Sequence, residues 1–230
     1  NLTVNERVRR APRGQHQAQQ WSHDLLQIGN GTVPTHAFLG TDMIKVDDNL
    51  ILKTSDQSAN SQSVTDLIRY VYDDFPQVDV DVNERASYFS GRVILSPKNV
   101  DVNEVNDKVM ELLSGATKVC LSADSVSFDD EHAHHYPIEF LNSLDMSGLP
   151  THELRLKPGA CVMLLRNLDP NRGLCNGSRM ILTHIGSHVL TGVLTSGTHR
   201  GNTVTIPRIT LIPSDTRFPF TLRRRQFPIK

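Results

Sequence analysis

Residues 156–186 read LKPGACVMLLRNLDPNRGLCNGSRMILTHIG, in which short apolar runs alternate with residues that favour turns. The same alternation continues to residue 211, whereas a helix would need about ten or more residues with a period of 3.6. The apolar runs lie at residues 161–165, 180–185, 188–194 and 203–211, with turn residues at 169–173, 176–177, 186 and 197. Short strands at this spacing are typical of a small β barrel, which we expect over residues 156–212.

Earlier parts of the chain show helical spacing instead. Trp21, Leu25 and Ile28 fall on one face of a helix over residues 15–28, and glycines that follow directly end this helix. Residues 64–75 return to the same period. We therefore expect two helices ahead of the β region.

A third helix stands between two short apolar runs. Residues 92–95 and 118–121 have the composition of buried strands, and Asp101 is placed to cap the helix between them. Strand, helix and strand in this order predict a parallel sheet. The fold class that we expect is therefore α/β, with a parallel-sheet domain that carries an all-β module.

The charges of the chain are unevenly distributed. Residues 151–230 hold 12 Lys and Arg against 3 Asp and Glu, which gives +9, whereas residues 1–150 carry −10. A basic half suits a polyanion such as nucleic acid, although a solvated basic surface fits the charge equally well. No apolar run reaches the roughly 18 residues of a membrane span. The three cysteines form no CxxC pair, which argues against a disulfide framework or a zinc site.

Motifs for catalysis are mostly missing. The phosphate loop GxxxxGK[ST] needs a Gly-Lys pair, and none occurs in the chain. Residues 128–131, FDDE, imitate the acidic pair of ATPases, but no phosphate loop precedes them and we interpret them as a solvated loop. His132, His134 and His135 lack the spacing of zinc ligands. We therefore expect no metal site.

Several strings, taken in order, resemble one family of motor proteins. They are LTVNER at 2–7, IGNG at 28–31, ILSPKNVDVNEVN at 94–106, LSADS at 121–125, YPIEFLNSL at 136–144, LRLKPGACVMLLRNL at 154–168, RGLCNGSR at 172–179 and RRQFPIK at 224–230. They resemble the Pif-type (petite integration frequency) DNA helicases of superfamily one, especially the eukaryotic branch that includes Helitron transposon helicases.

The resemblance implies a two-lobed motor, of which this chain is similar to the second lobe. Residues 1–135 and 208–230 would form part of a RecA-like domain, and residues 136–207 an inserted barrel resembling the Src-homology-three fold. ATP and Mg²⁺ would bind to the intact protein through a first RecA-like lobe that this chain lacks. We expect the chain alone to be inactive as an ATPase.

The resemblance also assigns roles to individual residues. Arg7 matches an arginine that reaches across the lobe cleft to the γ-phosphate, where a guanidinium neutralises developing charge; a surface arginine is the alternative. Ser96, Lys98 and Asn99 match a loop that faces the DNA backbone, although capping of the helix explains them almost as well. In the barrel, Asn176, Arg166 and Arg179 are candidate DNA contacts, while Asn176-Gly177 also suits a tight turn. The run Arg223 to Arg225 fits a DNA contact or a solvated strand.

The function that the resemblance implies is that of an ATP-dependent 5′-to-3′ DNA helicase, acting on single-stranded and duplex DNA. Its expected settings are DNA repair, recombination and telomere maintenance. We expect a monomer, at an intracellular site that is nuclear or mitochondrial, with no membrane partner. Two alternatives stay open: a stand-alone module that binds single-stranded nucleic acid, and an inactive remnant of a transposon.

Overall fold

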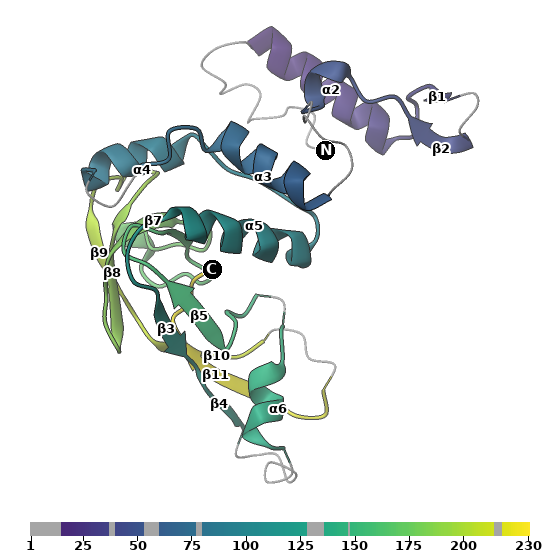
Figure 1. Cartoon of the computed structure of the whole chain (residues 1–230). Coiled ribbons are helices and arrows are strands. Elements are labelled where there is room, and N and C mark those ends of the chain that lie inside the picture. Colours follow the sequence, from purple (N-terminus) through teal and green to yellow (C-terminus); the bar gives the residue numbers. More distant parts are fainter. Residues whose placement is uncertain are drawn as a thin grey trace. The chain divides into compact units, whose positions relative to one another are not determined.

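The chain forms two compact units, residues 1–55 and 56–230 (Figure 1). The computed structural model describes residues 15–36, 40–52, 60–76, 80–127, 136–146, 148–213 and 218–230. Within these ranges, no helix is both long enough and apolar enough to cross a membrane.

The first unit is built around helix α2 (Gln15–Gly29), which confirms the first expected helix. Gly31, with a φ of +67°, lies in the turn that follows. The unit continues with the antiparallel strands β1 (Thr35–His36) and β2 (Gly40–Ile44) and the 3₁₀ helix η1 (Asp48–Leu50). The apolar residues Trp21, Leu25 and Ile28 of α2 remain about half exposed.

The second unit combines helices with three antiparallel sheets. Its helices are α3 (Asn60–Val71), α4 (Val82–Ser90), α5 (Asn99–Leu112) and α6 (Ile138–Ser143). Its strands are β3 (Lys118–Leu121), β4 (Ala123–Val126), β5 (Glu153–Leu156), β6 (Cys161–Met163), β7 (Arg179–Ile185), β8 (Val189–Leu194), β9 (Thr203–Pro207), β10 (Ile209–Leu211) and β11 (Leu222–Gln226). The strand orders are β6-β7-β8-β9, β10-β11-β4 and β3-β5.

The α/β class is confirmed, but the expected parallel sheet is wrong for the strands that the structure describes, because all of them pair antiparallel. Helix α5 and strand β3 form where we expected them. Residues 92–95 form no strand, and Val93 and Leu95 are 56% and 84% exposed. A parallel strand is normally buried on both faces. Strand β3 instead pairs with β5, which the sequence does not reveal because β5 comes from beyond α6.

The all-β region is confirmed as a four-stranded sheet whose core is closed by the last residues of the chain. Between residues 156 and 212, all of which are described, the one helical turn is η3 (Pro170–Arg172). The backbone N–H of Met163 donates to Lys230 O at 2.7 Å, and that of Leu165 donates to Pro228 O at 2.8 Å. Phe227 and Ile229 are fully buried there. We call β6–β9, their loops and residues 227–230 the β module. The boundaries of the expected domains stay a prediction.

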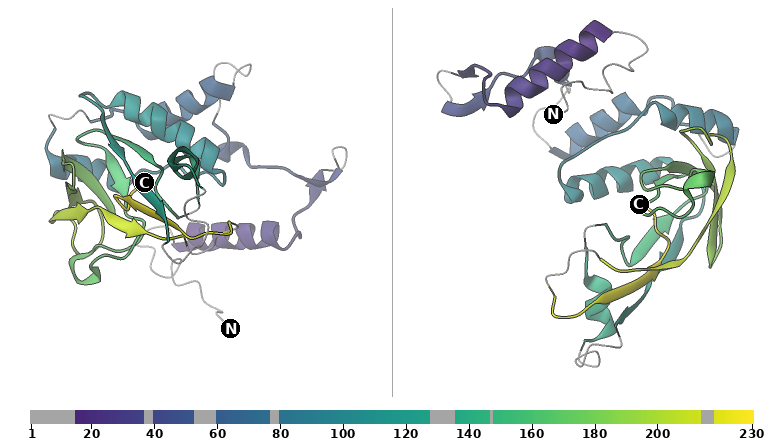
Figure 2. Two further views of the ribbon diagram at one scale, coloured as in Figure 1. Left: turned by 90° about the horizontal axis from the view of Figure 1, so that it is seen from below. Right: turned by 180° about the vertical axis from the view of Figure 1, so that it is seen from behind.

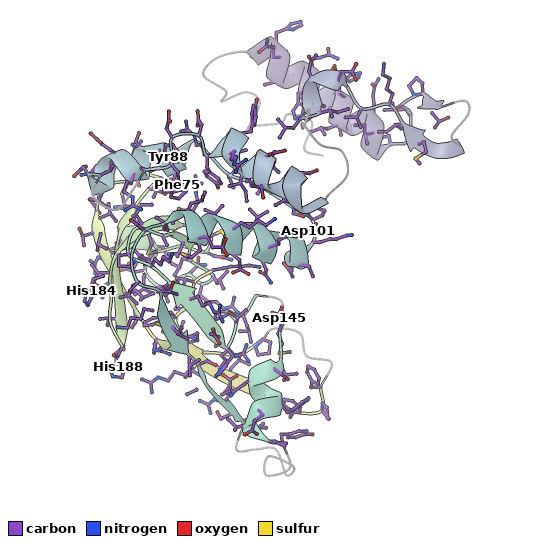
Figure 3. The ribbon with its side chains drawn as sticks, in the orientation of Figure 1. Phe75, Tyr88, Asp101, Asp145, His184 and His188 are labelled. Carbon is purple, nitrogen blue, oxygen red and sulfur yellow. The ribbon has the colours of Figure 1, made fainter. Side chains whose placement is uncertain are left out.

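Helices α3, α4 and α5 pack beside the β module, with α3 and α5 side by side in different views (Figures 1 and 2). An aromatic cluster joins α4 to the end of α3. In this cluster, Phe75 and Tyr88 meet edge to face with ring centroids 6.4 Å apart (Figure 3). Such pairs contribute about 0.5–1.5 kcal/mol beyond the burial of their area.

Cations of the β region bind the C-terminal ends of two helices. Arg179 donates from Nη1 to Phe89 O at 3.1 Å and from Nη2 to Ser90 O at 3.0 Å, at the end of α4. Lys157 Nζ donates to Met110 O and Leu113 O at the end of α5. The last carbonyls of a helix lack partners inside the helix and carry partial negative charge, so these cations are well placed.

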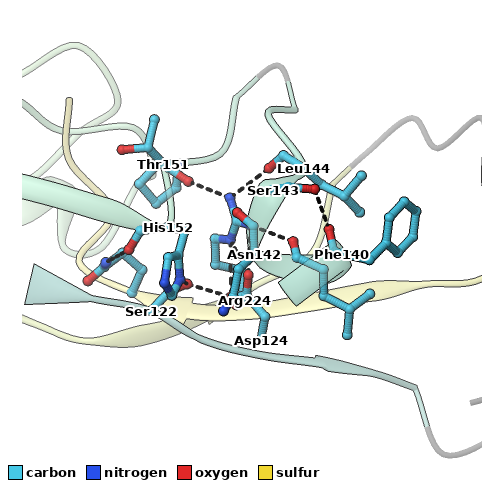
Figure 4. Close-up of polar contacts among 12 residues, drawn as sticks. Ser122, Asp124, Phe140, Asn142, Ser143, Leu144, Thr151, His152 and Arg224 are labelled. Carbon is cyan, nitrogen blue, oxygen red and sulfur yellow. Dashed lines mark hydrogen bonds and ion pairs between the residues drawn. The ribbon is translucent and has the colours of Figure 1, made fainter. Parts of the chain in front are cut away.

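A buried ion pair joins three further elements (Figure 4). Arg224 on β11 is fully buried, and its Nη2 lies 2.6 Å from Oδ2 of Asp124 on β4. Its remaining N–H groups donate to the carbonyl oxygens of Leu141, Leu144 and Pro150 and, from Nε, to Asp124 again. All five guanidinium donors are therefore satisfied, which a buried charge requires.

The carboxylate of Asp124 has a second partner. Ser122 Oγ donates to Asp124 Oδ1 at 2.6 Å and lies 2.8 Å from Nδ1 of His152. Two residues after Arg224 on β11, Gln226 Nε2 donates to Cys120 O and to His152 O. Strands β3, β4, β5 and β11 are thereby linked through side chains as well as through their backbones.

We expect Arg224→Met to lower the free energy of unfolding by about 3–5 kcal/mol, because it leaves the Asp124 carboxylate buried without its partner. Arg225→Met is the matched control, since Arg225 is the exposed neighbour on the same strand and its loss should change stability by less than about 0.5 kcal/mol. Urea unfolding followed by circular dichroism measures both. Equal effects of the two substitutions would contradict the role given to Arg224.

Gly159→Ala is expected to destabilise the protein more than Gly197→Ala. Both glycines have positive φ, +84° and +80°, so both substitutions carry the same backbone strain of about 1 kcal/mol. A methyl group at Gly159 would also overlap the guanidinium of the buried Arg85, whereas Gly197 has open space around it. The overlap should add about 1–3 kcal/mol, and thermal unfolding of the two variants side by side tests this difference.

Candidate nucleic-acid interface

The stretch of chain from the start of η3 to residue 213 carries no negatively charged side chain. Residues 170–213 contain four arginines and no Asp or Glu. These are four of the twelve Lys and Arg residues of positions 151–230. Between Asp169 and Asp215 the sequence thus offers no carboxylate that would repel a phosphate backbone.

Two of these connections meet at one end of the sheet. We call them the 170s loop (residues 169–178) and the 199 turn (residues 195–202). Several backbone bonds fix the 170s loop, including Leu174 N–H to Asp169 O at 2.9 Å, and Ser178 Oγ closes it by donating to Gly173 O at 2.8 Å. In the 199 turn, Gly201 N–H donates to Leu194 O at 2.9 Å. Both connections are therefore held in defined conformations.

Two adjoining polar depressions lie between the 170s loop and the 199 turn, with volumes of about 450 and 400 Å³. The first is lined by Asn171, Arg172, Asn202 and Thr203, and the second by Asn176, Ser178, Ser196 and Thr198, among others. His199 lines both. Its ring lies against Gly173, where a Cβ atom would come within 3.0 Å of His199 Cδ2.

The structure separates the three DNA-binding candidates of the β module. Asn176 is exposed and lines the second depression, and its backbone N–H donates to Asn167 Oδ1 at 2.7 Å. Gly177 has a φ of +85°, which confirms the tight turn. Arg166 and Arg179 are half-buried and line neither depression. Arg166 Nη1 donates to the carbonyl of its neighbour Leu165, and Arg179 is engaged with the end of α4. All three stay predictions as DNA contacts.

Ser96, Lys98 and Asn99 lie in the turn that begins α5, away from the loops that form the depressions. Ser96 Oγ donates to Asp101 Oδ2 at 2.8 Å, and Lys98 is the N-cap residue but makes no capping bond with its side chain. Asp101 therefore lies in the first turn of the helix and is not its cap. Lys98 and Asn99 are exposed, so both are accessible to a ligand.

The remaining candidate residues lie outside the described part of the chain, and the thiol of Cys161 is not activated as a nucleophile. Arg7 and residues 128–135, with their acidic run and histidines, are outside the described part of the chain. Within that part, no group of three His, Cys, Asp or Glu side chains is arranged to hold a metal. Burial raises the pKa of Cys161 to about 11, although the nearby Arg179 opposes the rise. Cys161 is therefore a neutral thiol at physiological pH.

Sequence reasoning missed His199 and left Arg224 undecided. His199 belongs to no motif, and its place at the centre of the depressions follows from the pairing of β8 with β9 and from the fold of the 170s loop. Arg224 stands in a run of three arginines and is nevertheless fully buried. Alternation of apolar and polar residues reveals the buried face of a strand only when the buried positions are apolar. Two of the three buried positions of β11 are Arg224 and Gln226, so the sequence does not show this alternation.

Comparison with known proteins finds one family. Residues 139–185 match the family model described as the 2B domain of DNA helicase Pif1. This segment includes most of α6 together with β5, β6, the 170s loop and β7. No curated protein matches the chain.

Solved structures of the same family are similar at a low level. One structure, which describes DNA unwinding at forked duplex DNA by two coordinating Pif1 helicases, is 21% identical in sequence to this chain. The match covers 76% of this chain and 32% of the helicase chain, with a TM-score of 0.41. Pif1 from Bacteroides bound to single-stranded DNA is 21% identical, covers 58% and 28%, and has a TM-score of 0.40. Pif1 from Candida albicans is 17% identical, covers 73% and 42%, and has a TM-score of 0.41. The chain thus spans between about a quarter and two fifths of the length of these proteins.

We expect Cys161 to resist alkylation by iodoacetamide at pH 8 in the folded protein and to react after unfolding in urea. Its raised pKa keeps it protonated below pH of about 11, and the thiolate is the reactive form. Cys175, which lines the second depression, is the internal control and should react in the folded protein. Peptide mass spectrometry distinguishes the two sites, and rapid labelling of Cys161 in the folded state would contradict its raised pKa.

Proposed function

We propose that this chain is part of an ATP-dependent 5′-to-3′ DNA helicase, in which its β module contacts the DNA strand along which the motor moves. The match of residues 139–185 to the Pif1 2B domain is the observation that carries the proposal. The segment holds the 170s loop, which together with the 199 turn forms the two depressions.

The chemistry of this surface suits the backbone of DNA. Arg172 is exposed at the edge of the first depression, and a guanidinium forms strong charge-assisted bonds with phosphate oxygens. The amides and hydroxyls around it are the uncharged groups that commonly contact phosphate and sugar. Such contacts position a strand without reading its sequence, as a motor that moves along DNA requires. Duplex DNA ahead of the motor is the second proposed partner.

Hydrolysis of ATP would require residues of a first lobe in addition to residues of this chain. The sequence has no phosphate loop, so ATP and Mg²⁺ would be held mainly by a first lobe in the intact protein. Arg7 would reach the γ-phosphate and neutralise charge that develops during hydrolysis. The exposed Lys98 and Asn99 would add contacts to the same DNA strand.

The 230-residue chain alone should not hydrolyse ATP, with or without single-stranded DNA, because its sequence has no phosphate loop to bind the β- and γ-phosphates. A coupled-enzyme assay measures this directly. The longer protein that contains the chain should unwind a duplex with a 5′ single-stranded tail, and Arg7→Ala should abolish its ATP turnover while leaving DNA binding intact. Turnover by the pure 230-residue chain that is lost on Arg7→Ala would overturn this division of roles.

The 230-residue chain should bind a short fluorescein-labelled oligo-dT with an affinity that falls as salt rises. Arg172→Ala should weaken this binding and reduce the slope of log K against log[salt] by about 0.7, the contribution of one phosphate contact on a single strand. Arg155→Ala is the matched control, since Arg155 is exposed on β5 and pairs with Glu153. Fluorescence anisotropy over a range of salt measures both slopes, and equal slopes would remove Arg172 from the interface.

A second candidate function is a stand-alone module that binds single-stranded nucleic acid. It is favoured by the hydrophobic core of the β module, to which residues before β6 and residues after β9 in the sequence both contribute. In this case, binding of oligo-dT would be the complete activity, and Arg7→Ala in the longer protein would change nothing. The ATPase and unwinding measurements therefore distinguish the two functions.

A further inference from the structure

We propose that the two depressions form one site for adjacent nucleotides of a single strand, and that the ring of His199 stacks on a base where the strand crosses from one depression to the other. This inference rests on the proposed function, because it specifies how the β module would hold DNA. It names a class of ligand, unpaired nucleotides, and a residue that no motif identifies.

The arrangement of the depressions supports a ligand that crosses both. They adjoin, and His199 lines each of them. Their volumes, about 450 and 400 Å³, fall within the range of about 300–1,000 Å³ that is usual for small-ligand sites. A strand that occupied both would therefore pass over the position of His199.

The chemistry on the two sides of His199 is complementary. Among the described residues, Arg172 is the one arginine that lines either depression, and the first depression also offers the amides of Asn171 and Asn202 and the hydroxyl of Thr203. The second is lined by Asn176 and by the hydroxyls of serine and threonine residues. One phosphate would be held at Arg172, while uncharged donors and acceptors would contact sugar and base edges.

Within residues 170–213, His199 is the one aromatic ring at the end of the sheet that carries the 199 turn. Residues 170–213 contain no Phe, Tyr or Trp. Their other two histidines, His184 and His188, lie by the turn between β7 and β8, at the opposite end of these strands from the 199 turn (Figure 3). Histidine is among the side chains on which unpaired bases of nucleic acids stack.

The side chain of His199 lies close to the backbone at Gly173. Gly173 has a φ of +79°, and any side chain there would meet His199 Cβ and Cδ2 at 3.0 Å. The carbonyl of Gly173 is in turn held by Ser178 Oγ at 2.8 Å. A ring that is held before the ligand arrives loses little conformational entropy on binding.

The test uses the 230-residue chain and two labelled probes, oligo-dT and an abasic strand of equal length. His199→Ala should weaken binding of oligo-dT about tenfold, in line with the loss of one base stack, and His199→Phe should restore most of the affinity. On the abasic strand, the wild type and His199→Ala should bind equally, because there is no base to stack. Unchanged thermal unfolding of both variants confirms that the fold is intact.

The outcomes separate this inference from the proposed function. If the wild type binds oligo-dT and His199→Ala binds it equally well, the stacking role is wrong while DNA binding stands. A tenfold loss that is the same on the abasic strand also overturns stacking, because it assigns His199 to the backbone or to the shape of the loops. If the wild type binds neither probe, the proposed function fails and this inference fails with it.

Discussion

The ion pair between Arg224 and Asp124 is the constraint on which the rest of the second unit depends. It fixes β11 against β4 and binds the carbonyls at the end of α6. From β11 the chain passes directly to Phe227 and Ile229, which are buried in the core of the β module. The pairing of residues 228–230 with residues 163–165 sets the start of the segment that leads into the 170s loop. The charge of Arg224 in the β10-β11-β4 sheet thus helps to position the 170s loop on the β6-β7-β8-β9 sheet.

Burying this charge has a cost that is offset only because every donor of the guanidinium finds an acceptor. A buried ion pair is often no more stabilising than apolar residues of the same volume, but it is strongly destabilising to break. Its value here lies in specificity, since an apolar side chain at position 224 would not select one arrangement of β4, β11 and α6. Arg179 on β7 and Lys157 just before β6 each bind the carbonyls at the end of one helix.

The sequence predicted those features that arise from local periodicity, and it failed where distant segments pair. Helices α2 and α5 and the short strands after residue 156 follow from apolar spacing and from turn residues. The antiparallel partner of β3 and the burial of Arg224 do not, because each depends on a segment far along the chain. Of the candidate DNA contacts in the β module, Asn176 lies at the depressions, whereas Arg166 and Arg179 bind backbone carbonyls. His199 had no sequence signal, since a single histidine in a turn is uninformative until its neighbours are known.

The central claim is that this chain contacts a nucleic-acid strand through the 170s loop and the 199 turn. The most direct test is a titration of the ¹⁵N-labelled chain with oligo-dT, followed by amide chemical shifts. The account predicts that the largest shifts cluster at residues 169–178 and 195–204, with the amides of β4 and β11 unchanged. Shifts confined to other parts of the chain, such as the turn at residues 96–101, would contradict it.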